Sequence, residues 1–218
     1  MKNHTDDPGS IQKEPAIEQP AVYLQSFGAA ETVTGSKHLL LTPEMNILID
    51  CGLFQGIKAL REKNWEKPPV NPADIGAMIL THAHLDHCGY IPLLVKNGYR
   101  KKIYMSRPTR DLAELILRDC AKLQEEDAAK ANKHGYSRHH PAEALYTVKD
   151  VEAALPFFEV CEISTVVRLT DWIRFSLHPA GHIAGACSIK FNCYGKTIVF
   201  SGDIWLRVSE LLPAPVPL

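Results

Sequence analysis

The sequence predicts an α+β fold in which two β-sheets lie between helices. Strand-like segments fill the first third of the chain, helices dominate the middle, and strand-like segments return in the last third. With 218 residues, 45% hydrophobic and 22% charged, the chain has the size and composition of one sizeable globular domain. Because each sheet and each helix has an apolar side to bury, we expect them to stack in layers.

The opening third predicts an antiparallel start to one sheet, followed by a helix. Apolar residues mark the strands, and residues 42–44 supply the turn between two of them. Pro68, Pro69 and Pro72 favour an extended connection after the helix, because proline lacks a backbone donor. The predicted strands cover residues 22–27, 38–41 and 46–49, and the helix covers 58–65.

The rest of the chain predicts three helices and six strands. In the longest helix, Leu112, Leu115, Ile116 and Leu123 form one apolar face at helical spacing. Residues 194–196 are typical of a hairpin turn. The predicted helices cover 91–96, 110–133 and 147–155, and the strands cover 77–81, 103–105, 166–169, 172–178, 187–193 and 197–201.

The ends of the chain differ from its body in composition. Polar residues 1–20 predict a disordered leader and proline-rich residues 205–218 an extended tail, which leaves 21–204 as the folded domain. No apolar run reaches membrane-spanning length, so we expect no membrane partner. Six cysteines without a C-x-x-C pair predict reduced, mostly buried thiols in a cytoplasmic protein. A formal net charge of -1 supplies no global attraction for nucleic acid.

Three histidines and one aspartate crowd into six positions within residues 81–89, which read T-H-A-H-L-D-H-C-G. Since residues i and i+2 of an extended segment point the same way, His82 and His84 can hold one metal ion. Asp86 and His87 come where the chain turns into the next helix, and they can hold a second ion. Histidine nitrogen with carboxylate oxygen suits zinc best, although iron, manganese or cobalt also fit. A solvated histidine-rich loop is the alternative, but it explains neither this density nor the position after a buried strand.

Three further residues have the form of site residues. His182 lies in a loop of small residues, where glycines let the backbone approach a crowded centre. Asp203 follows a strand and could bridge two ions, and Asp50 could orient a ligand histidine through its ring N–H. Each alone also fits a simpler role, as a satisfied loop histidine for His182 or a turn residue for Asp50 and Asp203.

Together these segments resemble the metallo-β-lactamase superfamily, whose hallmark is H-x-H-x-D-H. The V-T-G-S element at 33–36 and the D-C-G-L-F-Q-G element at 50–56 further resemble the β-CASP nucleases, an RNA-processing branch. That branch includes the nuclease subunit of the eukaryotic cleavage and polyadenylation factor and its bacterial and archaeal relatives. The resemblance covers about Val22 to Asp203 and implies the αββα sandwich of the superfamily.

The resemblance implies two zinc ions that share one bridging ligand. It assigns His82, His84 and His182 to one ion, Asp86 and His87 to the other, and Asp203 to the bridge. It also gives catalytic roles to Asp50, which orients a ligand, and to Asp86, which helps to position the nucleophile. The implied reaction is phosphodiester hydrolysis by a metal-bound hydroxide. The implied partner is single-stranded RNA, while DNA as substrate and assembly into a homo-oligomer stay open.

One departure from the family pattern concerns the C-terminal side of Asp203. In β-CASP nucleases a cap domain follows this aspartate, and a return segment then supplies a further histidine to the second ion. This chain ends at Leu218, and Trp205 stands where relatives often have the glycine of a Gly-Arg pair. We therefore expect an incomplete sandwich without cap and return segment, weak occupancy of the second metal site, and poor RNA cleavage by this chain alone.

Two other functions remain open at this point. The first is a metallo-hydrolase of the same fold that cleaves a small ester, thioester or lactam. The second is a non-catalytic module that keeps a structural metal.

Overall fold

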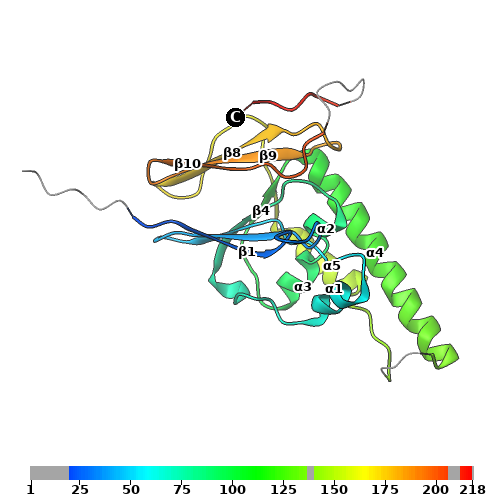
Figure 1. Cartoon of the computed structure of the whole chain (residues 1–218). Helices are drawn as coiled ribbons and strands as arrows, with labels where there is room; N and C mark the ends of the chain where they lie inside the picture. Colours follow the sequence, from blue (N-terminus) through cyan, green and yellow to red (C-terminus); the bar gives the residue numbers. More distant parts are fainter. Residues whose placement is uncertain (1–19, 137–139, 206–211, 218) are drawn as a thin grey trace, which may run out of the picture.

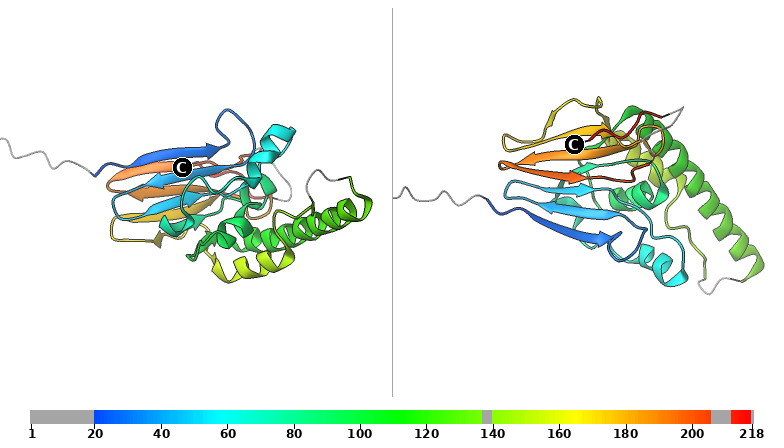
Figure 2. Two further views of the ribbon diagram at one scale, coloured as in Figure 1. Left: turned by 90° about the horizontal axis from the view of Figure 1, so that it is seen from below. Right: turned by 45° about the horizontal axis from the view of Figure 1, so that its top comes forward.

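The computed structural model describes residues 20–136, 140–205 and 212–217. Within them, two sheets lie face to face, and the helices pack against the outer side of the first sheet (Figures 1 and 2).

The first sheet has six strands in the order β1-β2-β3-β4-β5-β6. Its first three strands pair antiparallel and are joined by the loops 29–36 and 42–45. Strands β3 to β6 pair parallel and are joined by longer, mostly helical crossovers. The strands are β1 (Tyr23–Gly28), β2 (Lys37–Leu41), β3 (Asn46–Ile49), β4 (Ile75–Ile79), β5 (Ile103–Met105) and β6 (Phe158–Val160).

The second sheet has four antiparallel strands in the order β10-β9-β8-β7. The turn between β9 and β10 contains Tyr194 and Gly195, which both have positive φ, as a two-residue hairpin of type I′ requires. The strands are β7 (Val167–Arg168), β8 (Ile173–Pro179), β9 (Cys187–Cys193) and β10 (Lys196–Phe200).

Local sequence signals set the ends of the main helices. Ser106 caps the start of α4 by accepting from the backbone N–H of Thr109, and Gly135 ends it in a left-handed conformation. Thr147 and Asp150 form a capping box at the start of α5. The helices are α1 (Lys58–Glu62), η1 (Lys63–Trp65), η2 (Pro72–Asp74), α2 (Leu85–Cys88), α3 (Ile91–Lys96), α4 (Arg107–His134), α5 (Val148–Ala154) and η3 (Leu155–Phe157).

The central strands of the first sheet bury both of their faces. Successive side chains of a strand point to opposite sides, so Leu40 of β2 and Ile47 of β3 face the second sheet. Their neighbours Leu39 and Leu48 face the helices. The two resulting hydrophobic clusters hold three layers together: helices, first sheet and second sheet.

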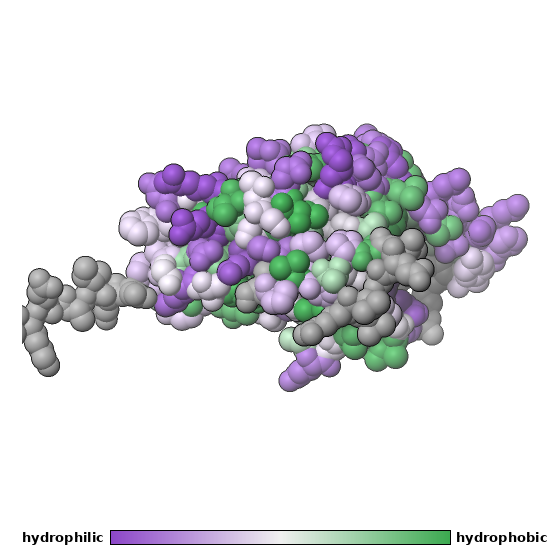
Figure 3. Space-filling model, turned by 90° about the horizontal axis from the view of Figure 1, so that it is seen from above, coloured by the Kyte–Doolittle hydropathy of each residue, from purple (hydrophilic) through white to green (hydrophobic). Residues whose placement is uncertain are grey.

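The outer face of the second sheet carries several polar side chains. Strand alternation places Arg174, Lys190, Asn192 and Thr197 on it, and hydrophilic and hydrophobic side chains mix on the side seen in Figure 3. Within the described part of the chain, no helix covers this face. The predicted incomplete αββα sandwich is therefore confirmed as three of its four layers.

Most predicted elements are present, with ends shifted by up to three residues. The predicted apolar face of α4 is confirmed for Leu112 and Ile116, which pack against the core, and wrong for Leu115 and Leu123. Leu115 and Leu123 are 63% and 53% exposed, and Ala113, Leu117 and Ala121 are buried instead. One end of α4 projects beyond the other elements (Figure 1). The sequence analysis also missed the three-residue strand β6.

The six cysteines are free thiols, and five of them are buried, as expected. None of the described helices is long and apolar enough to cross a membrane. The predicted leader lies outside the described residues except for Pro20, and so do residues 206–211 and 218 of the predicted tail. Residues 212–217 form no helix or strand, and the backbone N–H of Val216 donates to the carbonyl of Pro179 at 3.1 Å.

Candidate metal centre

Asp50 is the buried anchor of the site. It follows β3 with a φ of +57°, a left-handed conformation that aspartate tolerates better than most residues. Its carboxylate accepts hydrogen bonds from the backbone N–H of Thr81 at 2.8 Å, the Thr81 hydroxyl at 2.9 Å and His87 Nδ1 at 2.8 Å. One side chain thus connects the end of β3 to the histidine motif after β4.

Thr81 sets the orientation of His82. Since its hydroxyl hydrogen is donated to Asp50, Thr81 Oγ1 accepts from His82 Nδ1 at 3.0 Å. His82 Nε2 then carries the free lone pair, and it is the atom that faces the other candidate ligands. Such an outer partner both fixes the tautomer and makes the ring a better metal ligand.

The segment after Asp50 holds the short helix α2 in place. The backbone N–H of Cys51 donates to the carbonyl of His87 at 2.7 Å, and that of Leu53 donates to Leu85 at 2.9 Å. Gly52 lies so close that a Cβ there would meet the carbonyl oxygen of Asp86 at 1.6 Å. This contact explains why a glycine follows Cys51. Asp86 and His87 lie inside the turn of α2, not before the next helix as the sequence analysis expected.

The start of α4 fixes the loop that carries His182. Hydroxyl groups of Ser106 and Thr109 donate to the carbonyl of Gly185 at 2.7 and 2.9 Å. Gly185 has a φ of +80°, and a Cβ there would lie 2.5 Å from the backbone nitrogen of Thr109. The expected close backbone approach therefore occurs, against the N-terminus of a helix.

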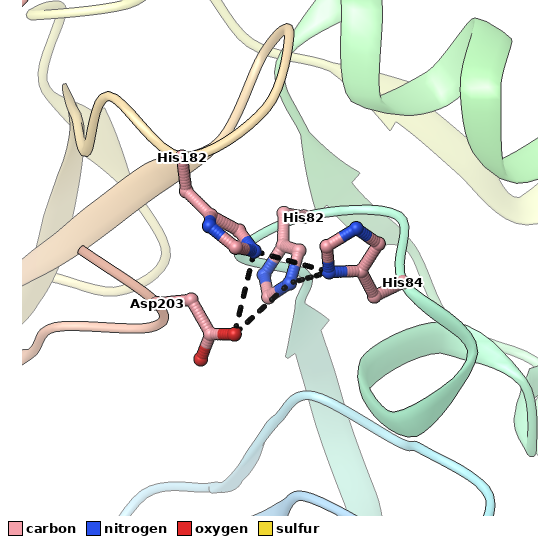
Figure 4. A group of neighbouring side chains, drawn as sticks. All are labelled: His82, His84, His182 and Asp203. Atoms are coloured by element: carbon pink, nitrogen blue, oxygen red, sulfur yellow. Dashed lines mark hydrogen bonds and ion pairs between the residues drawn. The ribbon is translucent and has the colours of Figure 1, made fainter. Parts of the chain in front are cut away.

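Three histidines and one carboxylate converge, as Figure 4 shows. His84 Nδ1 lies 3.1 Å from both His82 Nε2 and His182 Nε2. Asp203 Oδ2 lies 3.4 Å from His182 Nε2 and 3.8 Å from His82 Nε2. Four ligands of one tetrahedral zinc ion are about 3.4 Å apart, so this spacing suits a divalent ion. We call this group the three-histidine half of the site.

The second carboxylate oxygen of Asp203 faces a different histidine. Asp203 Oδ1 lies 3.4 Å from His87 Nε2, while Oδ2 faces the three-histidine half. His87 Nδ1 donates to Asp50, and the half-buried Asp86 adds negative charge near the His87 ring. We call His87, Asp86 and Asp50 the acidic half of the site. Asp203 stands between the two halves with one oxygen toward each.

The two halves have opposite effects on histidine pKa. Burial, followed by the neighbouring histidines, lowers the pKa of His82 to about 2, and burial also lowers the pKa of His182. Burial lowers the pKa of His87 too, but the hydrogen bond and charge of Asp50 outweigh it and raise that pKa above its usual value. The neutral forms of His82 and His182 are therefore free to act as ligands, and the field around His87 favours a cation.

These residues fit a metal ion by their donor set. His82 Nε2 and His182 Nε2 both face His84 Nδ1, so one proton on His84 Nδ1 would be shared between two acceptors, whereas a single metal ion can bind all three nitrogens. The buried Nδ1 of His182 has no hydrogen-bond partner among the described atoms. A cleft of about 350 Å³ adjoins the acidic half and extends from Asp50, His87 and Asp203 along β10 to Leu24 and His38.

All seven sequence-predicted site residues meet at one edge of the sheets. Their metal-binding and catalytic roles stay predictions. The sequence analysis assigned no role to Thr81, Ser106 or Thr109. The hydroxyl of Thr81 next to the histidine cluster was a usable signal, whereas the contact of α4 with Gly185 joins residues 76 positions apart and has no local signature.

The comparisons with known proteins agree with this geometry. Residues 38–215 match the family described as "Metallo-beta-lactamase superfamily". Ribonuclease TTHA0252 of Thermus thermophilus is 36% identical over 189 residues, which cover 87% of this chain and 39% of the relative. The transcription termination factor FttA and an RNase J-like protein, both of Methanocaldococcus jannaschii, are each 32% identical and cover 87% and 88% of this chain, and 28% and 39% of their own lengths.

A solved structure, the metallo-β-lactamase fold protein YhfI of Bacillus subtilis, is 16% identical with a TM-score of 0.49, over 85% of this chain and 63% of that one. This chain spans less than two fifths of the length of the relatives named above. The family match covers most of the chain and includes all of the candidate ligands. The chain belongs to the metallo-β-lactamase superfamily, and its relatives agree with the predicted RNA-processing branch.

Proposed function

We propose that this chain forms the metal-binding part of a metal-dependent ribonuclease that hydrolyses phosphodiester bonds of single-stranded RNA. The observation that carries the proposal is the position of Asp203, whose two oxygens face the three-histidine half and His87. A carboxylate in this position suits two ions a few ångström apart. Two such ions are a common arrangement for phosphoryl transfer, because each can stabilise one of the two oxygens that change partners.

Zinc is the metal we propose. His82, His84, His182 and Asp203 would hold one ion, and Asp86, His87 and Asp203 the other. Nitrogen and carboxylate ligands at tetrahedral spacing favour zinc over the harder magnesium or calcium ions. The ions would supply the positive charge that activates water and stabilises the leaving oxygen.

The chain's own residues would orient the metal ligands and the attacking water. Asp50 holds His87 by its Nδ1, and Thr81 holds His82 by its Nδ1, so that both Nε2 atoms point toward Asp203. The half-buried carboxylate of Asp86 would orient the attacking water. RNA is the proposed substrate because relatives of this chain carry the names ribonuclease and RNase J-like protein.

The test is a cleavage assay with purified, zinc-loaded protein and labelled single-stranded RNA. Single-stranded DNA and a small ester are run in parallel. We expect slow RNA cleavage that chelation stops and that His84→Ala reduces to background. Turnover of the ester without RNA cleavage would favour a small-molecule hydrolase. Equal RNA cleavage by the wild type and His84→Ala would contradict the proposal.

A further inference from the structure

We infer that Trp205 is a nucleobase-stacking residue that binds the base next to the phosphate held at the metal centre. The inference rests on the proposed ribonuclease function and adds a substrate-binding residue to it. It starts from an unusual placement, because a large aromatic side chain is exposed at the edge of the three-histidine half of the site.

Trp205 lies beside the three-histidine half of the site. It follows Asp203 by two positions, and its ring centroid is 5.8 Å from that of His182, at an angle of 49°. Its side chain is nevertheless largely solvent-exposed, with 58% of the residue surface accessible. The indole therefore lies against a candidate ligand and still presents surface to a bound molecule.

Two contacts hold the backbone from Gly202 to Trp205, so the indole starts from a fixed backbone position. The backbone N–H of Trp205 donates to the carbonyl of Ala180 at 3.2 Å, next to the His182 loop. Before it, Gly202 has a φ of +55° and approaches Thr81 so closely that a Cβ would lie 2.9 Å from that side chain. A pre-positioned aromatic ring loses little conformational entropy when a base stacks on it.

The other two tryptophans differ from Trp205 in their surroundings. Trp65 and Trp172 are exposed to nearly the same extent, 60% and 61%. The ring of Trp172 stacks on Tyr194 beside the β9–β10 turn, and Trp65 lies in η1. Among the ring contacts of the described residues, Trp205 is the tryptophan that meets a candidate ligand. The other two are therefore matched controls of equal exposure.

The charge of the chain makes stacking a suitable source of RNA affinity. With a formal net charge of -1, the chain has no global field to attract phosphate groups. Phosphate attraction would then come from the metal centre, and stacking on the bases can add further affinity. Stacking on one aromatic side chain contributes enough to change affinity by about 5- to 100-fold, and it tolerates any base sequence.

The competing role for Trp205 is to cover His182 and keep metal in place. The two roles differ in what Trp205→Ala changes. A stacking residue affects RNA affinity and leaves zinc affinity unchanged. A residue that only covers His182 affects zinc affinity, and RNA binding falls only as far as zinc is lost.

The experiment measures binding of a labelled single-stranded RNA of roughly ten nucleotides to zinc-loaded protein, by fluorescence anisotropy. A strand of equal length without bases is the second probe. We expect Trp205→Ala to weaken RNA binding about 5- to 100-fold and Trp205→Phe to restore most of it. The strand without bases should bind both proteins equally. Trp65→Ala and Trp172→Ala should match the wild type, and zinc content should stay constant. In the Trp65→Phe/Trp172→Phe protein, RNA should quench the fluorescence of Trp205.

Equal RNA affinity of the wild type and Trp205→Ala would overturn the inference while leaving the proposed function intact. Loss of zinc from Trp205→Ala, or an equal effect on the strand without bases, would also overturn it. If the wild type bound no RNA and cleaved none, the proposed function would fail, and the inference with it.

Discussion

The two halves of the metal centre are held by different means. In the three-histidine half, imidazoles from a strand end and from a distant loop converge on one point, and His82 among them is buried with a strongly lowered pKa. In the acidic half, Asp50 holds one histidine and, with Asp86 and Asp203, surrounds it with negative charge. The first half offers a nearly complete set of neutral donors, whereas the second offers charge and fewer donors.

This difference indicates unequal affinity for metal. Four ligand atoms in the first half lie within 4.8 Å of one another, which is enough for a closed tetrahedral site. The second half provides His87, Asp86 and the shared Asp203 among the described residues. We therefore expect one tightly bound zinc ion and one weakly bound ion, and the following predictions test that asymmetry.

The largest expected effect comes from His84→Ala, which removes the ligand at the centre of the three-histidine half. His84 Nδ1 lies 3.1 Å from both neighbouring nitrogens, so its loss opens the site. Zinc affinity should fall by more than the roughly 10–100-fold typical of outer partners of a ligand. Competition with a chromophoric chelator measures it. His134→Ala, at an exposed histidine near the end of α4, is the matched control and should bind as the wild type does.

Asp50→Asn should separate the halves. Asparagine keeps the size of the side chain and tolerates the positive φ, but it removes the charge that holds His87. Binding of the second ion should fall about 10–100-fold, while the first ion stays tight. Zinc titration followed by calorimetry resolves the two events. Equal weakening of both would mean that the halves do not act as separate sites.

Thr81→Val should affect both halves moderately, because the Thr81 hydroxyl contacts Asp50 and His82. We expect a loss of about 1–3 kcal/mol in unfolding free energy, since a buried carboxylate loses a donor. Thr81→Ser keeps the hydroxyl and should retain most of the stability in urea unfolding. If valine and serine variants were equally stable, the hydroxyl would not be the connecting group.

The smallest expected effect is the pH dependence of stability of the metal-free protein. The pKa of His82 is lowered to about 2, so its contribution is present above the unfolded pKa of 6.5 and is lost as pH falls below it. The pKa of His87 is raised, so its contribution is present below 6.5 and is lost as pH rises through the folded pKa. Relative to the wild type, His82→Gln should therefore gain stability toward acid pH and His87→Gln should lose it. Urea unfolding in chelator between about pH 5 and pH 8 measures both slopes. If the unfolding free energies of the two variants changed with pH in parallel, the environments assigned to His82 and His87 would be contradicted.

The sequence was sufficient to predict those features whose signal is local and chemical. The spacing of His82, His84, Asp86 and His87 predicted a cluster at a strand end, and β3, β5, α3 and β9 have the predicted limits. Asp203 and His182 were found because each stands in a loop after a predicted strand. To predict that they meet in space, one must know the order of the strands in the two sheets, and local sequence patterns do not contain it.

Prediction failed where a feature depends on distant packing. The apolar residues of α4 show helical spacing, but Leu112 and Ile116 pack against the core whereas Leu115 and Leu123 are exposed, and the spacing alone does not separate the two pairs. The carbonyl of Gly185 is bound by Ser106 and Thr109, and nothing in their local sequence indicates that contact. The same holds for Trp205, whose neighbour His182 is 23 positions away.

Zinc stoichiometry and affinity test the central claim most directly. The protein is stripped with chelator, titrated with zinc by calorimetry, and analysed for bound metal after dialysis, alongside Asp203→Asn. The asymmetric site predicts one zinc ion per chain retained through dialysis, a second bound only at higher zinc concentration, and weaker binding of both in the variant. Two equally tight zinc ions per chain, or tight binding that Asp203→Asn leaves unchanged, would contradict it.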